Sequence, residues 1–210
     1  MIALLHTGEV HVERFEKIIK EHFDGLEISH FVNTEILDRA LKDGELDEEN
    51  FQKEVAKIQK NNPDLIICTC STYGELSEQT EGVVRIDLPI ADYIVSKYSK
   101  IGVVFTAKST KDTSNRLLLN RAKIQGKNIE LVNYDCSEFW SHFEEGNFEL
   151  YEKGIARKIE EVEGEVEVFF LAQASMQGAK NYLTHLKKEV LTSPEYGIKT
   201  MISEWLDDRN

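Results

Sequence analysis

The stretch "IALLHTG", residues 2–8, is an apolar run that ends in Thr-Gly and leads into "VERFEKIIKEHF" (12–23), where apolar residues recur at helical spacing. The same succession returns at "IGVVFTA" (101–107), which precedes the helix-like "STKDTSNRLLLNRA" (109–122). The threonines that end the two runs, Thr7 and Thr106, lie 99 residues apart. A buried strand followed by an amphipathic helix is the beginning of a βαβ unit, so the chain is expected to build parallel sheets.

Two further pairs of segments repeat with a similar displacement. "LKDGEL" (41–46) precedes "FQKEVAKI" (51–58), and "FEEGNF" (143–148) precedes "YEKGIARKI" (151–159). "PDLIICTCST" (63–72) corresponds to "EVEVFFLAQAS" (165–175). Three matches in the same order, each displaced by about 100 residues, indicate an internal duplication.

The two halves predict an α/β fold of two pseudo-symmetric lobes, each with a parallel-type sheet flanked by helices. "LEISHFVN" (26–33) and "KNIELVNYD" (127–135) add one strand to each half. The expected domains are 1–96, 97–192 and a C-terminal helix within 193–210 that can pack back on the first lobe. Since open α/β sheets bind ligands at the carboxyl ends of their strands, we expect an active-site cleft between the lobes.

Composition excludes several classes of protein. Apolar residues make up 41 % of the chain, charged residues 30 %, and the net charge is −13, with no Lys/Arg run to attract nucleic acid or an anionic membrane. No stretch reaches the roughly 18 apolar residues that cross a bilayer, and the N-terminus lacks the pattern of a signal peptide. Three cysteines make no disulfide framework. We therefore expect a cytoplasmic protein, and a homo-oligomer is compatible with the sequence.

Four predicted strand ends carry small or hydroxyl-bearing residues: Thr7-Gly8, Cys70-Ser71-Thr72, Thr106-Ala107 and Gln173-Ala174-Ser175. Hydroxyls and helix N-terminal amides at such ends suit an anionic group. Taken singly, each could be no more than the polar end of a buried strand. The symmetric set favours a binding site, and Thr110, in the following helix, is included in it.

The chain resembles the aspartate/glutamate/hydantoin racemase superfamily over nearly its whole length. The residues that carry the resemblance are "DLIICTCST", with Asp64 six positions before Cys70, together with "IALLHTG" and "IGVVFTAKST". "RIDLPIADYIV" (85–95), with Arg85 and Asp87, is similar to a stretch of a less characterised branch. The resemblance implies two pseudo-symmetric α/β lobes and a catalytic cysteine at Cys70, with no metal or organic cofactor.

One departure from the family pattern bears on the mechanism. The second catalytic cysteine should fall in "FFLAQASMQG", where this chain has Gln173. Racemisation needs an acid–base group on each face of the substrate carbon, and a carboxamide does not exchange protons near neutral pH. The symmetric two-thiol mechanism is therefore not expected.

The remaining candidate groups follow from this departure. Amide N–H groups near Cys70 are expected to lower its pKa and favour a thiolate, whereas Cys68 is expected to pack in the strand. Gln173 and Ser175 would donate hydrogen bonds to a carboxylate or an enolate-like intermediate. The expected substrate-binding residues are Thr7, Gly8, Ser71, Thr72, Arg85, Asp87, Thr106, Thr110, Ala174 and Ser175. A metal site built from Cys68, Cys70 and Cys136 is disfavoured because "CTC" lacks the usual ligand spacing.

The sequence thus predicts an isomerase- or lyase-like enzyme that acts on a small carboxylate through Cys70 alone. The alternative is a non-catalytic relative that binds a small carboxylate and has lost half of the chemistry. A thiol-dependent hydrolase is a weaker alternative, because no convincing Cys-His-Asp set is present.

Overall fold

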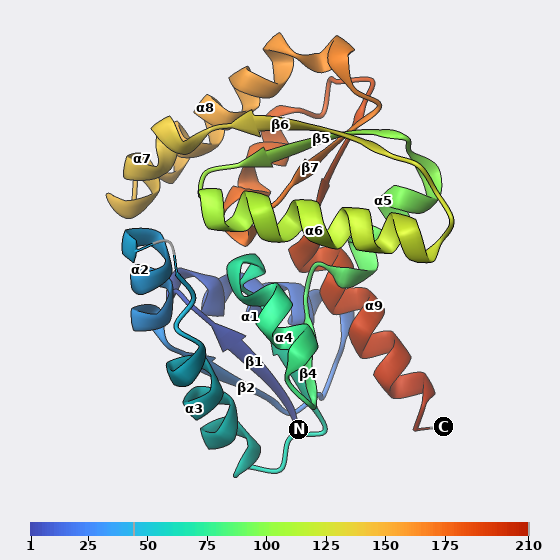
Figure 1. The fold of residues 1–210 in the computed structure, drawn as a ribbon. Coiled ribbons are helices and arrows are strands. Elements are labelled where there is room, and N and C mark those ends of the chain that lie inside the picture. The colour runs from blue at the N-terminus through green and yellow to red at the C-terminus, as the bar shows by residue number, and fades with distance from the viewer. Residues whose placement is uncertain (44, 210) are drawn as a thin grey trace. The chain divides into compact units, whose positions relative to one another are not determined.

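A computed structural model describes residues 1–43 and 45–209, which form two compact units (Figure 1). Unit 1 contains the chain up to Pro89 and the segment from Pro194 onward, and unit 2 runs from Ile90 to Ser193. The first break falls inside helix α5 (Leu88–Lys97), a few residues before the predicted boundary at 96/97.

Unit 1 is built on a four-stranded parallel sheet with the strand order β2-β1-β3-β4. Its strands and helices are β1 (Ile2–His6), α1 (Val10–His22), β2 (Ile28–Val32), α2 (Thr34–Asp43), α3 (Glu48–Gln59), β3 (Leu65–Cys68), α4 (Gly74–Gln79), β4 (Val83–Arg85), the start of α5, and α9 (Ser193–Asp207).

Side chains alternate between the two faces of β1, and each face is covered. Ala3 and Leu5 belong to a core that includes Phe51, Val55 and Ile58 of α3, which are spaced one helical turn apart. On α1 the buried residues Phe15, Ile18 and Ile19 follow the same spacing. The sheet of unit 1 therefore has apolar residues on both faces, as parallel sheets require.

Unit 2 repeats this architecture with the strand order β6-β5-β7-β8. Its elements are α5, β5 (Lys100–Phe105), α6 (Lys108–Ile124), β6 (Glu130–Asp135), α7 (Trp140–Glu144), α8 (Phe148–Glu161), β7 (Val168–Leu171) and β8 (Glu189–Thr192). Its core joins Phe169 and Leu171 of β7 to Tyr151, Ile155 and Ile159 of α8. The predicted α/β fold with two parallel sheets flanked by helices is confirmed.

The strand registers make the two units directly comparable. Ile2 pairs with Leu65 in unit 1, and Ile101 pairs with Val168 in unit 2. Counting five residues along each strand puts Thr7 in the position of Thr106, and Cys70 in the position of Gln173. The repeat seen in the sequence therefore recurs in strand order and register, and an internal duplication remains our interpretation of it.

Helix α9 belongs to unit 1, although it follows unit 2 in the chain. A Cβ atom added to Gly197 of α9 would lie 2.2 Å from the carbonyl oxygen of Ile86, so helix and backbone are in close contact. Further along, Arg209 Nη1 donates to Asp64 Oδ1 at 2.6 Å. Unit 1 is therefore assembled from two separate parts of the chain.

Candidate functional site

In unit 1 the candidate site lies where β1 and β3 end. Thr69 N donates to Leu5 O at 3.0 Å, which continues the pairing of the two strands one residue beyond β3. Cys70 is the next residue and begins a 3₁₀ turn over Ser71–Tyr73, in which Tyr73 N donates to Cys70 O at 3.1 Å. Cys70 is therefore held at the carboxyl edge of the sheet, as expected from the sequence.

Donors from both strand ends surround the thiol of Cys70. The Thr7 hydroxyl, the Thr72 hydroxyl and N–H, and the Tyr73 N–H all favour its thiolate form. Burial opposes them more strongly, and the pKa of Cys70 is raised above its ordinary value. The expected lowering of this pKa is thus wrong, because removal from water outweighs the donors. At neutral pH Cys70 is a thiol with groups in place to stabilise a thiolate.

Ser71 adds an unsatisfied group next to Cys70. Its side chain is buried, and within the described residues its Oγ has no hydrogen-bond partner. A buried hydroxyl without a partner is uncommon, since desolvation without a hydrogen bond costs about 1–3 kcal/mol. This hydroxyl would be satisfied by a polar ligand bound beside Cys70.

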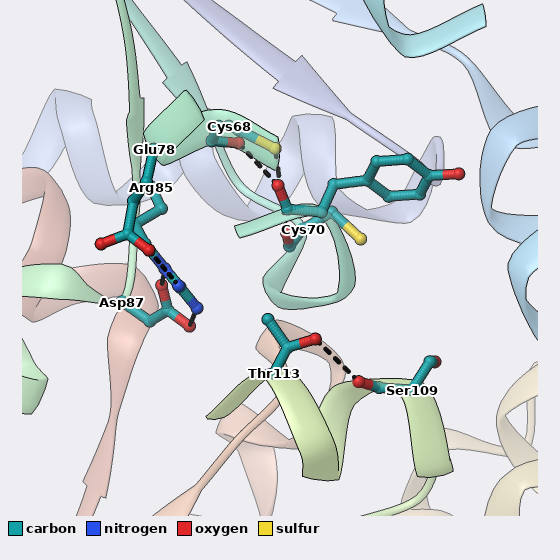
Figure 2. Close-up of polar contacts among 9 residues, drawn as sticks. Cys68, Cys70, Glu78, Arg85, Asp87, Ser109 and Thr113 are labelled. Atoms are coloured by element: carbon teal, nitrogen blue, oxygen red, sulfur yellow. Dashed lines mark hydrogen bonds and ion pairs between the residues drawn. The ribbon is translucent and has the colours of Figure 1, made fainter. Parts of the chain in front are cut away.

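The other two cysteines are packing residues. Cys68 and Cys136 are fully buried, and burial raises the pKa of each thiol to about 12. Cys68 Sγ points to the carbonyl oxygen of Cys70 at 3.8 Å (Figure 2). Among the residues that the structure describes, no three His, Cys, Asp or Glu side chains are grouped so that they could hold a metal ion.

Arg85 and Asp87, which were predicted to bind substrate, form a buried ion pair. Arg85 Nε donates to Asp87 Oδ1 at 2.6 Å, and Nη2 donates to Oδ2 at 3.0 Å. The third nitrogen, Nη1, donates to Glu78 Oε2 at 2.9 Å (Figure 2). Each of the three guanidinium nitrogens therefore donates to a carboxylate inside unit 1, and these contacts give Arg85 a supporting role between α4 and the end of β4.

In unit 2 the corresponding position is Gln173, and its oxygen is fully engaged. Oε1 accepts hydrogen bonds from Thr106 N at 2.7 Å, Thr106 Oγ1 at 3.0 Å and Ala107 N at 3.2 Å. Two of these donors are backbone N–H groups, which fixes the assignment of oxygen and nitrogen in the carboxamide. Nε2 is therefore turned away from them and offers two hydrogens to another acceptor.

A directed chain of hydroxyls supports this orientation. Thr106 Oγ1 donates to Gln173, so it accepts from Tyr151 OH, which lies 3.2 Å away. Tyr151 OH in turn lies 3.0 Å from Ser175 Oγ and accepts from it. The chain Ser175–Tyr151–Thr106–Gln173 runs in one direction and ends on the carboxamide oxygen. It makes Gln173 a donor toward any ligand at this strand end.

The structure places the remaining predicted residues beside these two sets. Gly8 lies between β1 and α1, Thr110 is buried in the first turn of α6, and Ala174 is the first residue after Gln173. The contacts join Thr7, Cys70 and Thr72 in unit 1, and Thr106, Gln173 and Ser175 in unit 2. The prediction that both sets serve one ligand is part of the proposal below.

Sequence reasoning missed His11 and Tyr151. His11 lies in the first turn of α1 beside Gly8, and its pKa is lowered to about 3 by burial and by Arg14. It is 99 residues before Thr110, so the repeat offset could have identified it. Tyr151 could have been found in the same way. The repeat aligns it with Phe51, and the two side chains differ only by the hydroxyl of Tyr151.

Solved structures share this fold. Glutamate racemase from Francisella tularensis, in complex with D-glutamate, superposes with a TM-score of 0.76 at 16 % identity, over 99 % of this chain and 81 % of that chain. Aspartate racemase from Picrophilus torridus gives 0.75 at 16 %, over 97 % and 93 %. Allantoin racemase from Klebsiella pneumoniae gives 0.68 at 14 %, over 96 % and 86 %. The chain therefore has the fold of these racemases.

Sequence comparison adds no closer relative. No family model matches the chain, and no curated protein matches it either. In the part of the chain that the structure describes, none of the helices is both long enough and apolar enough to span a membrane.

Proposed function

We propose that the protein is a divergent member of the racemase superfamily, an isomerase or lyase that acts on a small carboxylate without a cofactor. In this proposal Cys70 is the single acid–base group. The observation that carries it is the contrast between two equivalent strand ends. One presents a thiol surrounded by hydroxyl and amide donors, and the other presents a carboxamide whose oxygen is already bonded.

Cys70 would act mainly as a proton donor in the resting enzyme. Its raised pKa keeps the proton on sulfur at neutral pH. When a bond at the α-carbon of the substrate breaks and leaves its electron pair there, the S–H bond can break and the proton pass to that carbon. The resulting thiolate is stabilised by Thr7, Thr72 and the Tyr73 N–H, and it recovers a proton from water.

Gln173 would stabilise the negative charge of the substrate. Its Nε2 hydrogens are fixed outward by the hydroxyl chain, so it can hold a carboxylate or an enolate oxygen without reorganising. It cannot return a proton to a second face of the carbon, because a carboxamide does not titrate near neutral pH. Decarboxylation suits the resting thiol directly, because it needs only a proton donor. One-sided isomerisation and elimination begin with removal of a proton from the substrate, which the thiolate form of Cys70 would carry out.

The direct test is a screen of small carboxylic acids in D₂O, followed by NMR. We expect deuterium incorporation or conversion of at least one acid, abolished in Cys70→Ala and retained in the matched Cys136→Ala protein. The alternative to this enzymatic function is a non-catalytic protein that binds a small carboxylate. Saturable binding of an acid, with no exchange or conversion at any enzyme concentration, would favour that alternative and remove the catalytic role of Cys70.

A double-substitution cycle tests whether Gln173 and Cys70 serve the same ligand. The binding energy of the hit is measured in Gln173→Met, in Cys70→Ala and in the double variant. A coupling of about 0.5 kcal/mol or more is expected for residues that contact one ligand. Strict additivity would separate the two strand ends and restrict the proposal to Cys70.

A further inference from the structure

Unit 1 has a polar cavity that is formed by residues 16–30 and is lined by none of the strand-end residues described above. The cavity has a volume of 230 Å³. Four ionisable groups line it, together with an apolar wall that includes Phe23 and Ile28. The ionisable groups are Glu16 and Lys20 of α1, Asp24 in the following turn, and His30 of β2.

His30 is the outer end of a buried chain of polar groups. Its Nδ1 lies 2.8 Å from His6 Nε2, and His6 Nδ1 lies 2.8 Å from Thr69 Oγ1. Thr69 Oγ1 in turn donates to Leu5 O at 3.1 Å. Toward the cavity, the buried His30 Nε2 has no hydrogen-bond partner among the residues that the structure describes, and Glu16 Oε1 lies 3.5 Å from it.

Unit 2 shows that the fold does not need this chain. The registers place Phe105 in the position of His6, Ala172 in that of Thr69 and Asn133 in that of His30. Asn115, nine residues after Thr106 as Glu16 is nine after Thr7, donates from Nδ2 to Asn133 Oδ1 at 3.0 Å. In unit 2 an uncharged pair of amide side chains occupies this position, whereas unit 1 has a carboxylate, the buried imidazole of His6 and the partly buried imidazole of His30.

The charges of the cavity indicate what it would hold. Glu16 and Asp24 carry two negative charges, and among the described residues Lys20 is the only lysine or arginine that lines the cavity. Lys20 pairs with Glu16 but leaves 77 % of its side chain exposed, so this contact is weak and replaceable. A neutral His30 Nε2 accepts a hydrogen bond if its proton is on Nδ1, toward His6. In that arrangement His30 Nδ1 donates to His6 Nε2, and His6 Nδ1 donates to Thr69 Oγ1. The Thr69 hydroxyl in turn donates to Leu5 O.

We infer that this cavity is a binding site for a small organic ammonium ion. Its N–H groups would donate to the Glu16 carboxylate and to His30 Nε2, while its hydrocarbon part would lie against Phe23 and Ile28. The volume equals that of about eight liquid waters, which limits the ligand to a compact amine. The site is distinct from the proposed carboxylate chemistry and does not depend on it.

The test is an NMR titration of the full chain with benzylammonium, using benzyl alcohol and benzoate as neutral and anionic probes of similar shape. We expect saturable binding of benzylammonium that shifts the ring signals of His30, at least tenfold weaker binding of the alcohol, and no binding of benzoate. Equal binding of alcohol and amine, or no saturable shift at His30, would overturn the inference.

Variants separate this site from general charge effects. Glu16→Gln should weaken benzylammonium binding at least tenfold, and Lys20→Gln should strengthen it because the competing ammonium is gone. Glu21→Gln, an exposed change on the same helix, should leave binding unchanged, and so should Cys70→Ala. Binding that is insensitive to Glu16→Gln, or equally sensitive to Glu21→Gln, would contradict the assignment.

Discussion

At the scale of single residues, the environment of Cys70 decides which proton transfers are available. Its donors and its burial act in opposite directions on the pKa, and burial prevails. The sequence could place Cys70 at a strand end, since an apolar run breaks there into small polar residues. The sequence could not show whether the pKa of Cys70 is raised or lowered, because that depends on how far the surrounding chain removes water from the sulfur.

The raised pKa predicts a steep pH dependence of alkylation. Because the thiolate is the nucleophile, iodoacetamide labelling of Cys70 should be slow at pH 7 and rise about tenfold per pH unit through pH 9. Mass spectrometry of the labelled peptide measures the rate, with Cys70→Ala as the blank. Cys68 and Cys136 should stay unlabelled in the folded protein. A labelling rate that levels off below pH 8 would mean that the donors outweigh burial.

The orientation of Gln173 predicts the effect of a charge at this position. In Gln173→Glu one carboxylate oxygen can still accept from Thr106 N and Ala107 N, but the other becomes an anionic acceptor where Nε2 was a donor. Affinity for a small carboxylate should fall at least tenfold, while the melting temperature changes little. Isothermal titration with the best acid checks this, and Gln52→Glu on the surface of unit 1 is the control.

The position of Gly74, next to the Arg85 guanidinium, has no room for a side chain. A Cβ atom there would lie 2.3 Å from Arg85 Nη2, and the guanidinium is fixed by Asp87 and Glu78. Gly74→Ala should lower the free energy of unfolding by roughly 2–4 kcal/mol through this displaced buried pair. Gly164→Ala, with open space around it, should change it by less than about 1 kcal/mol in urea unfolding.

At the scale of elements, β1 and β2 are joined by the contact between buried His6 and partly buried His30 as well as by backbone pairing. Burial and the neighbouring His30 lower the pKa of His6 to about 3, far below its ordinary value of 6.5. Between these two values the unfolded chain binds a proton that the folded protein does not bind. Stability from this residue is therefore full above pH 6.5 and is lost as the pH falls toward 3.

The lowered pKa of His6 predicts that this residue reduces the free energy of unfolding in acid. Between pH 7 and pH 5, the residue should cost about 2 kcal/mol of unfolding free energy. His6→Phe, the residue found at the equivalent position of unit 2, should reduce that pH-dependent loss by about this amount, whatever its stability at pH 7. Urea unfolding at the two pH values measures the difference. An unchanged pH dependence in His6→Phe would show that His6 is already protonated in the folded state.

The central strands of both sheets could be predicted from sequence patterns. The long apolar runs around residues 2–6, 65–68, 101–105 and 168–171 predicted the central strands, because buried parallel strands are apolar on both faces. The edge strands β4 and β8 were not predicted. They have three and four residues and include charged or half-exposed positions, so neither has a distinctive periodicity.

At the scale of the whole molecule, the proposal that Cys70 and Gln173 serve one substrate predicts that a symmetric two-base reaction does not occur. We expect no racemisation of aspartate or glutamate, with wild-type protein indistinguishable from Cys70→Ala in a chiral chromatographic assay. Robust racemisation that disappears in Cys70→Ala would require another acid–base group for the second face. This prediction can be made from the sequence alone, because the repeat aligns Cys70 with Gln173. The hydroxyl chain through Tyr151 could not be predicted from the sequence, because folding alone brings those side chains together.

The return of α9 to unit 1 has a consequence for biosynthesis. Unit 2 is continuous in the chain, so it can fold as soon as its own residues have left the ribosome, whereas unit 1 is incomplete until α9, which follows unit 2, has been made. A fragment of residues 90–193 should therefore give a cooperative melting transition by itself, and residues 1–89 should not. Translation order makes α9 the last element to join unit 1, and the incomplete sheet of unit 1 is the part of the nascent chain that chaperones would have to protect.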